Sequence, residues 1–525
     1  MKNKIFIYDT TLRDGIQRAD ISFSVKDKLE LIERFDDIGI DYIEVGFPAS
    51  NPKEIQLFEQ LRSVKCKHSK IMAFGMTRHK DNAVEADQNL EVLVSSGADG
   101  VCVVGKASAM QVKNVIETTL DDNLAMIAET VKYLKEFFKE VHFDAEHFFD
   151  GFSDNEEYSL KVLETAAEAG ADIICICDTN GSVLPVKAGE IVKIVKKRIV
   201  VPVGVHYHND AGCADANSIL SVEKGADMVQ GTINGYGERC GNTDLCTIVP
   251  SLEIKMGKDC LGKGNLKHIT NLSRFVSETA NQIPYSHQPF VGHNAFAHKG
   301  GMHASGVSKL PEAFEHIKPD MVGNTRKILI SELSGKKSII LKAKELGIDL
   351  KNDNDRVRKI LDTIQSLEHK GYQFEAANGS FELLVREPAE KKKEYFTLES
   401  FRVLNEKTKD GNMLSEATVK VSIDGNRIIT TAEGNGPIHA IDGALRNALK
   451  SCYPGLSSIE LTDFKVRVLN QKEGTAAMVR VLIESSDGEK TWGTIGVSEN
   501  IIEASWQALE DSIIYGLMHL EKKNS

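Results

Sequence analysis

The sequence lacks the marks of several protein classes. Cysteine is sparse, with nine residues among 525, and no two follow the C-x-x-C spacing of a zinc or redox motif. No stretch approaches the roughly 18 consecutive apolar residues of a membrane span. The first residues, MKNKIFIYDT, contain no apolar run of signal-peptide length. These absences exclude a disulfide scaffold and predict a soluble protein of the reduced cytoplasm.

An excess of positive charge is also missing. Lys and Arg number 64 against 76 Asp and Glu, so the formal net charge is −12. Without dense basic runs, we expect neither nucleic acid nor a membrane as a partner. The net charge does not exclude a small anionic substrate, because a few local cations suffice to bind one.

The first 240 residues alternate between short apolar runs and stretches with helical periodicity. Glycine followed by Ile-Asp or Ala-Asp precedes every second run, at Gly39, Gly97, Gly170 and Gly225, where it suits the left-handed end of a helix. Eight such units over about 250 residues predict an α/β fold with a closed (β/α)₈ TIM barrel. An open doubly wound sheet would need a glycine-rich phosphate fingerprint after its first strand, where this chain has DTTLRDG. The expected strands cover residues 5–11, 42–48, 71–76, 100–105, 142–148, 173–179, 201–208 and 228–237.

Two further regions follow the predicted barrel. We assign residues 1–262 to the barrel, 263–397 to small helical linker subdomains and 398–525 to an α+β module. The module contains helical patterns at about 437–451 and 500–520 that share one register, which predicts an internal duplication. The shared positions are Ile438, Ala440, Ala444 and Leu445 in the first helix and Ile502, Ala504, Ala508 and Leu509 in the second.

Polar residues at the ends of the predicted strands suggest a metal site. His206 and His208 alternate on one strand, so both imidazoles face the same side, and Asp14 ends another strand. In a barrel these strand ends meet at one face. A mixed nitrogen and oxygen set suits Mn²⁺, Zn²⁺ or Mg²⁺. The alternative is a pair of hydrogen-bonded core histidines.

Four other residues are candidates for chemistry. Arg13 could grip a carboxylate or stabilise an oxyanion, or could form a surface salt bridge. Glu146, among aromatic residues in FDAEHFFDGF, could transfer protons, or could pair with Arg13 or a backbone amide. Asn242 could cap a helix that begins at Thr243, could bind the metal, or could do both. His303, flanked by small residues in GGMHASG, could be an acid or base delivered from another domain or subunit.

Three motifs together resemble the DRE-TIM metallolyase superfamily: DTTLRDG with Gln17, HYHND at 206–210, and GERCGN at 237–242. The C-terminal module is similar to the regulatory dimerisation domain of the 2-isopropylmalate synthase branch. Within that branch, FDAEHFFDGF and the region from HKGGMHASGV to SELSGK look most like the (R)-citramalate synthases.

This resemblance implies an acyltransferase that condenses acetyl-CoA with pyruvate and water, giving (R)-citramalate and CoA on a route to isoleucine. It also implies a divalent metal cofactor and a homodimer. Carried over to this chain, the family's metal ligands are Asp14, His206, His208 and Asn242, its catalytic residues are Arg13, Glu146 and His303, and its substrate contacts are Arg13 and Thr179.

The competing interpretations differ in substrate or in class. A 2-isopropylmalate synthase would use 2-oxoisovalerate and share every motif above. A hydroxymethylglutaryl-CoA-type lyase would not need residues 398–525. A barrel amidohydrolase normally carries its H-x-H pair at the end of the first strand. A metal-binding metabolite sensor would bind without turnover.

The C-terminal module adds no candidate acid, base or metal cluster, so we expect it to sense an effector; the alternative is dimerisation alone. The turn EGNGP at 433–437, just before a helix, offers backbone N–H groups and a positive dipole end to a carboxylate. Its duplicate is GVSEN at 496–500. Pathway logic drawn from the resemblance names isoleucine as the inhibitor.

Overall fold

The computed structural model describes residues 4–330, 335–351, 353–386, 394–407, 409, 411–469 and 477–524. Residues 331–334, which belong to the SELSGK stretch, lie outside the described residues. The chain divides into two compact units. The first runs to Phe296 and adds Ile317–Thr325, and the second contains Ala297–His316 and the chain from Arg326 onward.

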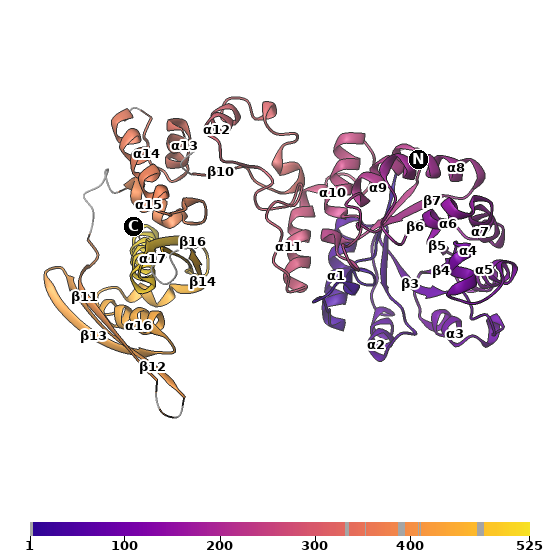
Figure 1. The fold of residues 1–525 in the computed structure, drawn as a ribbon, viewed down its shortest axis with the longest axis horizontal. Coiled ribbons are helices and arrows are strands. Elements are labelled where there is room, and N and C mark those ends of the chain that lie inside the picture. Colours follow the sequence, from indigo (N-terminus) through magenta and orange to yellow (C-terminus); the bar gives the residue numbers. More distant parts are fainter. Residues whose placement is uncertain are drawn as a thin grey trace. The chain divides into compact units, whose positions relative to one another are not determined.

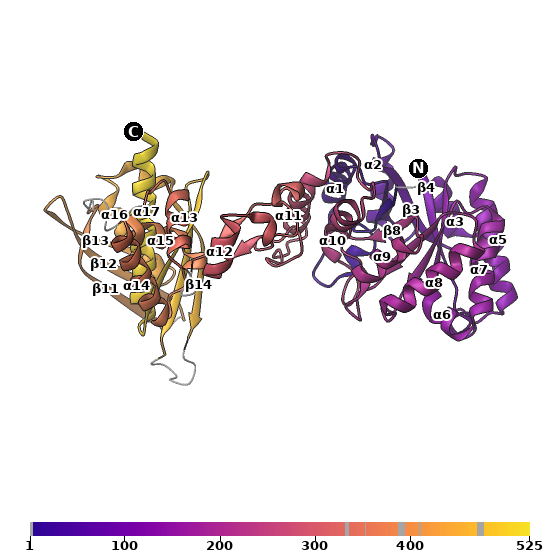
Figure 2. The same cartoon turned by 90° about the horizontal axis from the view of Figure 1, so that it is seen from above.

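The first unit is built on a closed barrel of eight parallel strands in the order β1 to β8, with helices after every strand (Figure 1; Figure 2). All eight predicted strands are therefore confirmed. The strands are β1 (Phe6–Asp9), β2 (Tyr42–Gly46), β3 (Lys70–Met76), β4 (Gly100–Lys106), β5 (Val141–Glu146), β6 (Ile173–Asp178), β7 (Val203–Tyr207) and β8 (Met228–Gly231). The helices are α1 (Val25–Ile38), α2 (Pro52–Leu61), α3 (Gln88–Ser95), α4 (Ala109–Asn114), α5 (Leu120–Lys135), α6 (Phe148–Asp154), α7 (Glu156–Ala169), α8 (Pro185–Arg198), α9 (Ala214–Glu223), α10 (Leu245–Pro250) and α11 (Ile269–Thr279).

Successive residues of each strand point alternately to the helices and into the barrel. On β6, for example, Ile174 and Ile176 belong to the core shared with the helices, whereas Cys175 and Cys177 belong to a separate interior cluster. Apolar side chains and thiols fill this interior, so the barrel is a packed core without a pore. The buried members of the interior cluster are Tyr8, Tyr42, Met72, Cys102, Ile173, Cys175, Cys177 and Met228.

Glycines end the helices before alternate strands, as predicted. Gly39, Gly97, Gly170 and Gly225 all have positive φ, at 89°, 76°, 106° and 108°. Gly39 caps α1 and Gly170 caps α7 in the left-handed conformation, each donating its N–H to carbonyls of the last turn. This left-handed geometry lets the chain leave the helix and enter the next strand within a few residues.

The second unit begins with helices and a short parallel pair of strands, then repeats one motif. Strands β11, β12 and β13 form an antiparallel sheet followed by α16, and β14, β15 and β16 form a second sheet followed by α17. The predicted duplication is therefore confirmed. The elements are β9 (Ala297–His298), α12 (Gly301–Val307), β10 (Lys327–Ile328), α13 (Lys336–Glu345), α14 (Asn354–His369), α15 (Asn378–Arg386), β11 (Thr397–Lys407), β12 (Met413–Ile423), β13 (Asn426–Gly434), α16 (Pro437–Leu449), β14 (Glu460–Val468), β15 (Val479–Ser486), β16 (Thr491–Ser498) and α17 (Ile501–Asn524).

The repeated helices bury equivalent positions. Ala440, Ala444 and Leu445 of α16 lie in the core of the second unit, and so do their counterparts Ala504, Ala508 and Leu509 of α17. The apolar face of each helix thus packs on its own sheet, and this is why the same spacing of apolar residues recurs in the sequence. Among the described residues, no helix combines the length and the hydropathy that crossing a bilayer requires.

Substitution by alanine should lower the free energy of unfolding by different amounts at the two capping glycines. A methyl group at Gly170 would meet only the Lys135 side chain at 3.5 Å, so Gly170→Ala should cost about 1–2 kcal/mol of left-handed strain. At Gly39 the same methyl group would lie 2.4 Å from the Leu261 carbonyl oxygen, so Gly39→Ala should cost about 1 kcal/mol more than Gly170→Ala. Urea unfolding followed by circular dichroism measures both. Equal shifts of the midpoint would contradict the steric argument.

Candidate metal centre and active site

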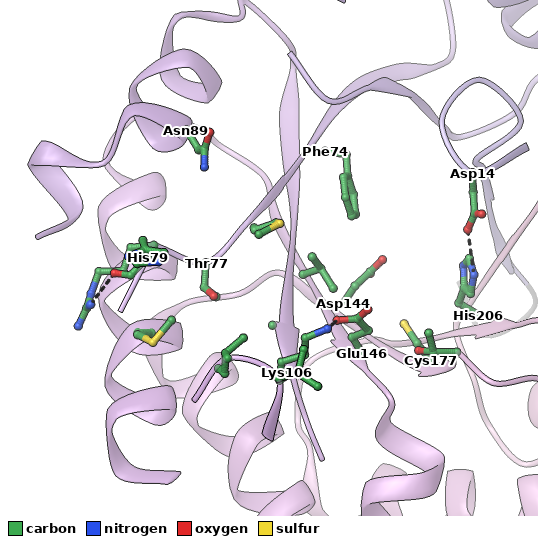
Figure 3. Close-up of a pocket in the computed structure, with 18 of the residues that line it drawn as sticks. Asp14, Phe74, Thr77, His79, Asn89, Lys106, Asp144, Glu146, Cys177 and His206 are labelled. Carbon is green, nitrogen blue, oxygen red and sulfur yellow. Dashed lines mark hydrogen bonds and ion pairs between the residues drawn. The ribbon is translucent and has the colours of Figure 1, made fainter. Parts of the chain in front are cut away.

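A cavity of about 630 Å³ opens at the C-terminal ends of the barrel strands (Figure 3). Asp14 and His206 face each other at one end, Lys106, Asp144 and Glu146 lie in the middle, and Thr77 and His79 mark the other end. The structure brings most of the predicted site residues to this one cavity. Those that line it are Arg13, Asp14, Glu146, Thr179, His206 and His208.

The predicted metal ligands form a compact cluster. Asp14 Oδ2 lies 3.3 Å from His206 Nε2 and 3.8 Å from His208 Nε2, and the two imidazole centroids are 5.1 Å apart. The ligand atoms of these three buried residues all lie within 4.8 Å of one another. One carboxylate and two imidazoles at this spacing can chelate a single divalent ion.

Asn242 lies in the loop after β8 and lines a second cavity, not the one lined by Asp14, His206 and His208. It forms an isolated antiparallel bridge with His208 and is 2% exposed. Gly237 permits this arrangement, because any Cβ there would lie 2.3 Å from Asn242 Oδ1. The capping alternative for Asn242 is wrong: α10 begins at Leu245, and Asp244 accepts the capping hydrogen bond from the Cys246 N–H.

The hydrogen-bond inventory supports a metal at this position. Asp14 Oδ1 and both polar side-chain atoms of Asn242 are buried without a hydrogen-bond partner among the described residues. A buried polar atom left without a partner costs about 1–3 kcal/mol. A cation bound between Asp14 and Asn242 would satisfy these oxygens, so the residues fit the group that the resemblance implies.

Backbone and charge hold Asp14 ready as an anionic ligand. The N–H groups of Arg13, Asp14 and Gly15 all donate to the Thr10 carbonyl, which folds the loop after β1 into a tight turn. Burial acts to raise the pKa of Asp14, but the charge of Arg13 and then the hydrogen bond to His206 outweigh it and hold that pKa well below its usual range.

Burial and nearby positive charge hold His208 in its neutral form. Burial, and after it the charge of His206, lowers the pKa of His208 to about 4. Arg239 adds a further positive charge, with Nη2 at 3.2 Å from His208 Nδ1. Because a guanidinium can only donate, Nδ1 accepts here and the proton of the neutral ring lies on Nε2, so a metal would bind at Nε2 only after this contact is exchanged for one in which Nδ1 donates.

Arg13 is fixed inside the barrel and is not a surface residue. Its Nε donates to the fully buried Glu44 at 2.6 Å, and its Nη1 lies 3.4 Å from Asp14 Oδ2. The guanidinium also stacks on Phe74 at 4.1 Å from the ring centroid. The surface salt-bridge alternative is therefore wrong, and the planar cation is held at the cavity wall where it can face a substrate oxygen.

Glu146 lies in a more polar place than its sequence neighbours suggest. It forms an ion pair with Lys106, and its side chain is 25% exposed. Phe148 and Phe149 are buried in the core shared with the helices. The alternative that Glu146 pairs with Arg13 is wrong, because Glu44 takes that place. Sequence reasoning missed Lys106, although its position two residues after Val104 on β4 puts it on the inward face.

The remaining predicted residues lie in different surroundings. Thr179 Oγ1 accepts a hydrogen bond from the His147 N–H at 2.9 Å, which leaves its own O–H to donate into the cavity. His303 belongs to the second unit, where it is exposed on α12 and its ring lies 5.4 Å from that of Phe314. Sequence reasoning also missed Gln230, which contacts His206 from β8.

Comparisons with known proteins agree with this arrangement. Residues 4–276 match the HMGL-like family, 290–372 match the homocitrate synthase post-HMGL domain-like family, and 375–517 match the LeuA allosteric (dimerisation) domain. The (R)-citramalate synthase of Aquifex aeolicus is 48% identical over 100% of this chain and 99% of its own length. That of Geobacter sulfurreducens is 47% identical over 98% of each chain. A 2-isopropylmalate synthase of Methanocaldococcus jannaschii is 31% identical over 99% of this chain and 96% of its own.

The cluster predicts that two buried aspartates, Asp14 and Asp178, differ in their effect on metal affinity. Asp14→Asn should lower the affinity for Mn²⁺ at least about 100-fold, because it removes the ligand charge. Asp178→Asn is the matched control. Asp178 also ends a barrel strand and is 1% exposed, but it accepts hydrogen bonds from Ser182 N and Val183 N outside the cluster. Titration of metal-stripped protein with Mn²⁺ measures both. Equal loss in the two variants would contradict this site.

Proposed function

The chain belongs to the (R)-citramalate synthases of the HMGL-like family, and we propose that it condenses acetyl-CoA with pyruvate and water to give (R)-citramalate and CoA. The single observation that carries this proposal is the cluster of Asp14, His206 and His208 in the barrel of a chain that matches those synthases over its full length. The 2-isopropylmalate synthase alternative has weaker support, at 31% identity.

We assign the metal site to Asp14, His206, His208 and Asn242. The family depends on divalent metals, and the nitrogen and oxygen donors here suit Mn²⁺, Zn²⁺ or Mg²⁺. When bound, such a metal supplies Lewis acidity toward the keto group of a 2-oxoacid.

Pyruvate would be held by Arg13 and Thr179. The Thr179 hydroxyl, already accepting from His147 N, can donate its proton to the substrate carboxylate. Arg13 keeps a fixed orientation between Glu44 and Phe74. Its guanidinium can stabilise the negative charge that develops on the keto oxygen as the carbonyl carbon is attacked, without reorganising first.

The acetyl group requires a base. By resemblance we assign it to His303, with Glu146 assisting and Lys106 holding the Glu146 carboxylate in place. The base takes a proton from the acetyl-CoA methyl group, the resulting carbanion forms a bond to the keto carbon of pyruvate, and the keto oxygen takes up a proton to become the hydroxyl of the product. Water then cleaves the thioester, which releases CoA with its thiol proton and leaves the new carboxylate, so the overall step is irreversible.

Substrate choice tests the proposal directly. We expect the chain to release CoA from acetyl-CoA faster with pyruvate than with 2-oxoisovalerate, and to release none when stripped of metal or carrying Asp14→Asn. A thiol assay with each ketoacid measures this. Preference for 2-oxoisovalerate would make the chain a 2-isopropylmalate synthase. Metal binding without turnover on either acid would favour a sensor, and full turnover without metal would contradict the mechanism.

The proposal includes the organisation of the chain. We retain residues 1–262, 263–397 and 398–525 as barrel, linker and regulatory regions, supported by the three consecutive family matches. The match to a dimerisation domain supports a homodimer. A cytoplasmic location and a role in making isoleucine complete the proposal.

We place the effector at the turn before α16. Its Gly436 caps the helix without a side-chain hydrogen bond. The duplicate turn before α17 differs, because Asn500 Oδ1 accepts from the N–H groups of Ile502 and Glu503. Only the first of the two turns thus leaves its helical N–H groups to an outside carboxylate, and this asymmetry supports a single isoleucine site in each repeat pair.

Two cap variants test the effector site. Gly436→Asp puts a carboxylate at the open cap, where the backbone is extended and a Cβ meets nothing within 4 Å. We expect it to raise the isoleucine concentration for half-inhibition at least about tenfold, because the new side chain occupies the same N–H groups. The control, Asn500→Asp, adds the same charge to a turn that is already capped and should leave inhibition unchanged. Millimolar isoleucine without effect on the rate or thermal stability of the unmodified chain would remove the assignment.

A further inference from the structure

We propose that Gln230 is a positioning residue that presets which nitrogen of His206 faces the metal site. The inference rests on the metal centre of the proposed function and assigns a role to a residue outside it. Gln230 on β8 is the register partner of His206 on β7, and its side chain is fully buried.

Two hydrogen bonds join three strands inside the barrel. Gln230 Nε2 donates to Asp144 Oδ1 at 3.0 Å, and Gln230 Oε1 lies 3.0 Å from His206 Nδ1. Asp144 lies on β5, three strands from β8 and two from β7 in the strand order. The amide therefore connects a carboxylate on β5 to a metal-site imidazole on β7.

The chemistry of the three groups allows only one arrangement of protons. A carboxylate can only accept hydrogen bonds, so Asp144 requires the NH₂ group of Gln230. The amide oxygen is then turned toward His206. An amide oxygen also only accepts, so the Nδ1 atom of His206 must carry the proton.

This sequence of bonds commits Nδ1 of His206 to Gln230 and turns Nε2 toward Asp14. Nε2 lies 3.3 Å from Asp14 Oδ2. In the metal-free chain a proton can bridge these two atoms, and a bound metal would take its place at the Nε2 lone pair. A histidine whose second nitrogen is fixed by a hydrogen bond is the usual support of a metal ligand. His208 lacks this kind of support, because its Nδ1 faces the Arg239 guanidinium, which can only donate.

The surroundings of Asp144 favour the Gln230 bond over alternatives. The groups gathered around this carboxylate are the thiols of Cys102, Cys175 and Cys177 and the carboxylate of Glu44. Thiols are weak donors and Glu44 is an acceptor when ionised, so the amide of Gln230 is the strong donor in the cluster. Its orientation is fixed by the Asp144 charge and not by packing alone.

Variants that exchange the carboxylate of residue 144 and the amide of residue 230 distinguish the positioning role of Gln230 from a role in packing. Gln230→Met keeps the volume but offers no acceptor, and should weaken Mn²⁺ binding about 10- to 100-fold. Gln230→Glu sets two carboxylates 3.0 Å apart and should bind Mn²⁺ at least as poorly. Asp144→Asn keeps an oxygen for Gln230 Nε2, so its Mn²⁺ affinity should fall by less than about threefold.

The double variant Asp144→Asn/Gln230→Glu is the decisive measurement. It restores one amide and one carboxylate, with the amide of residue 144 donating and the carboxylate of residue 230 accepting from both neighbours. We expect its Mn²⁺ affinity to return to within about threefold of the unmodified chain. Electron paramagnetic resonance of free Mn²⁺ gives each affinity, and the absorption spectrum of Co²⁺-loaded protein reports the ligand geometry.

Each result either supports or contradicts the positioning role of Gln230. Rescue in the double variant supports the positioning role, because packing would not distinguish it from Gln230→Glu. Unmodified Mn²⁺ binding in Gln230→Met, or no rescue in the double variant, overturns this inference and leaves the metal site intact. Failure of the unmodified chain to bind Mn²⁺ overturns the metal site itself. A Gln230→Met variant that does not fold leaves the decision to the isosteric double variant.

Discussion

Every second side chain of a barrel strand points inward, and the site depends on that constraint. In β7 the inward positions lead to His206, while Val203, Val205 and Tyr207 pack toward the helices. The interior cluster fills the lower barrel with apolar side chains and thiols. At the C-terminal ends of the strands, the same alternation directs polar side chains into the cavity. A slip of one residue in any of these strands would turn its ligand outward, so strand register and metal site are one feature.

Burying charge next to the cavity requires each charge to be balanced. Arg13 is shared between Glu44 and Asp14, and Tyr8 donates a second hydrogen bond to Glu44. These groups rigidly orient one another because few solvent molecules compete. Asp14 Oδ1 and the amide of Asn242 are among the exceptions, since they are buried without hydrogen-bond partners among the described residues. The fold gives up stability at these atoms, and they lie where a metal would be held.

Local signals in the sequence were sufficient for the architecture. Short apolar runs, helical periodicity and glycines at helix ends each depend on neighbours within a few residues, and all eight strands follow from them. The His206 and His208 pair also needed only strand alternation. The duplicated module was visible because α16 and α17 bury equivalent positions. Local signals failed for Asn242, which resembles a helix cap but lies two residues ahead of the capping Asp244.

The sequence by itself thus determined the elements, their order and the side of each strand that faces the barrel. Only the tertiary structure decided which polar groups meet. Glu44 and not Glu146 binds Arg13, Lys106 binds Glu146, and Asp144 binds Gln230 across separations of 31, 40 and 86 residues. These partners stand on different strands, and their distances depend on how the sheet closes and how far its strands are staggered. No local pattern encodes that closure, because it arises from the packing of the whole barrel at once.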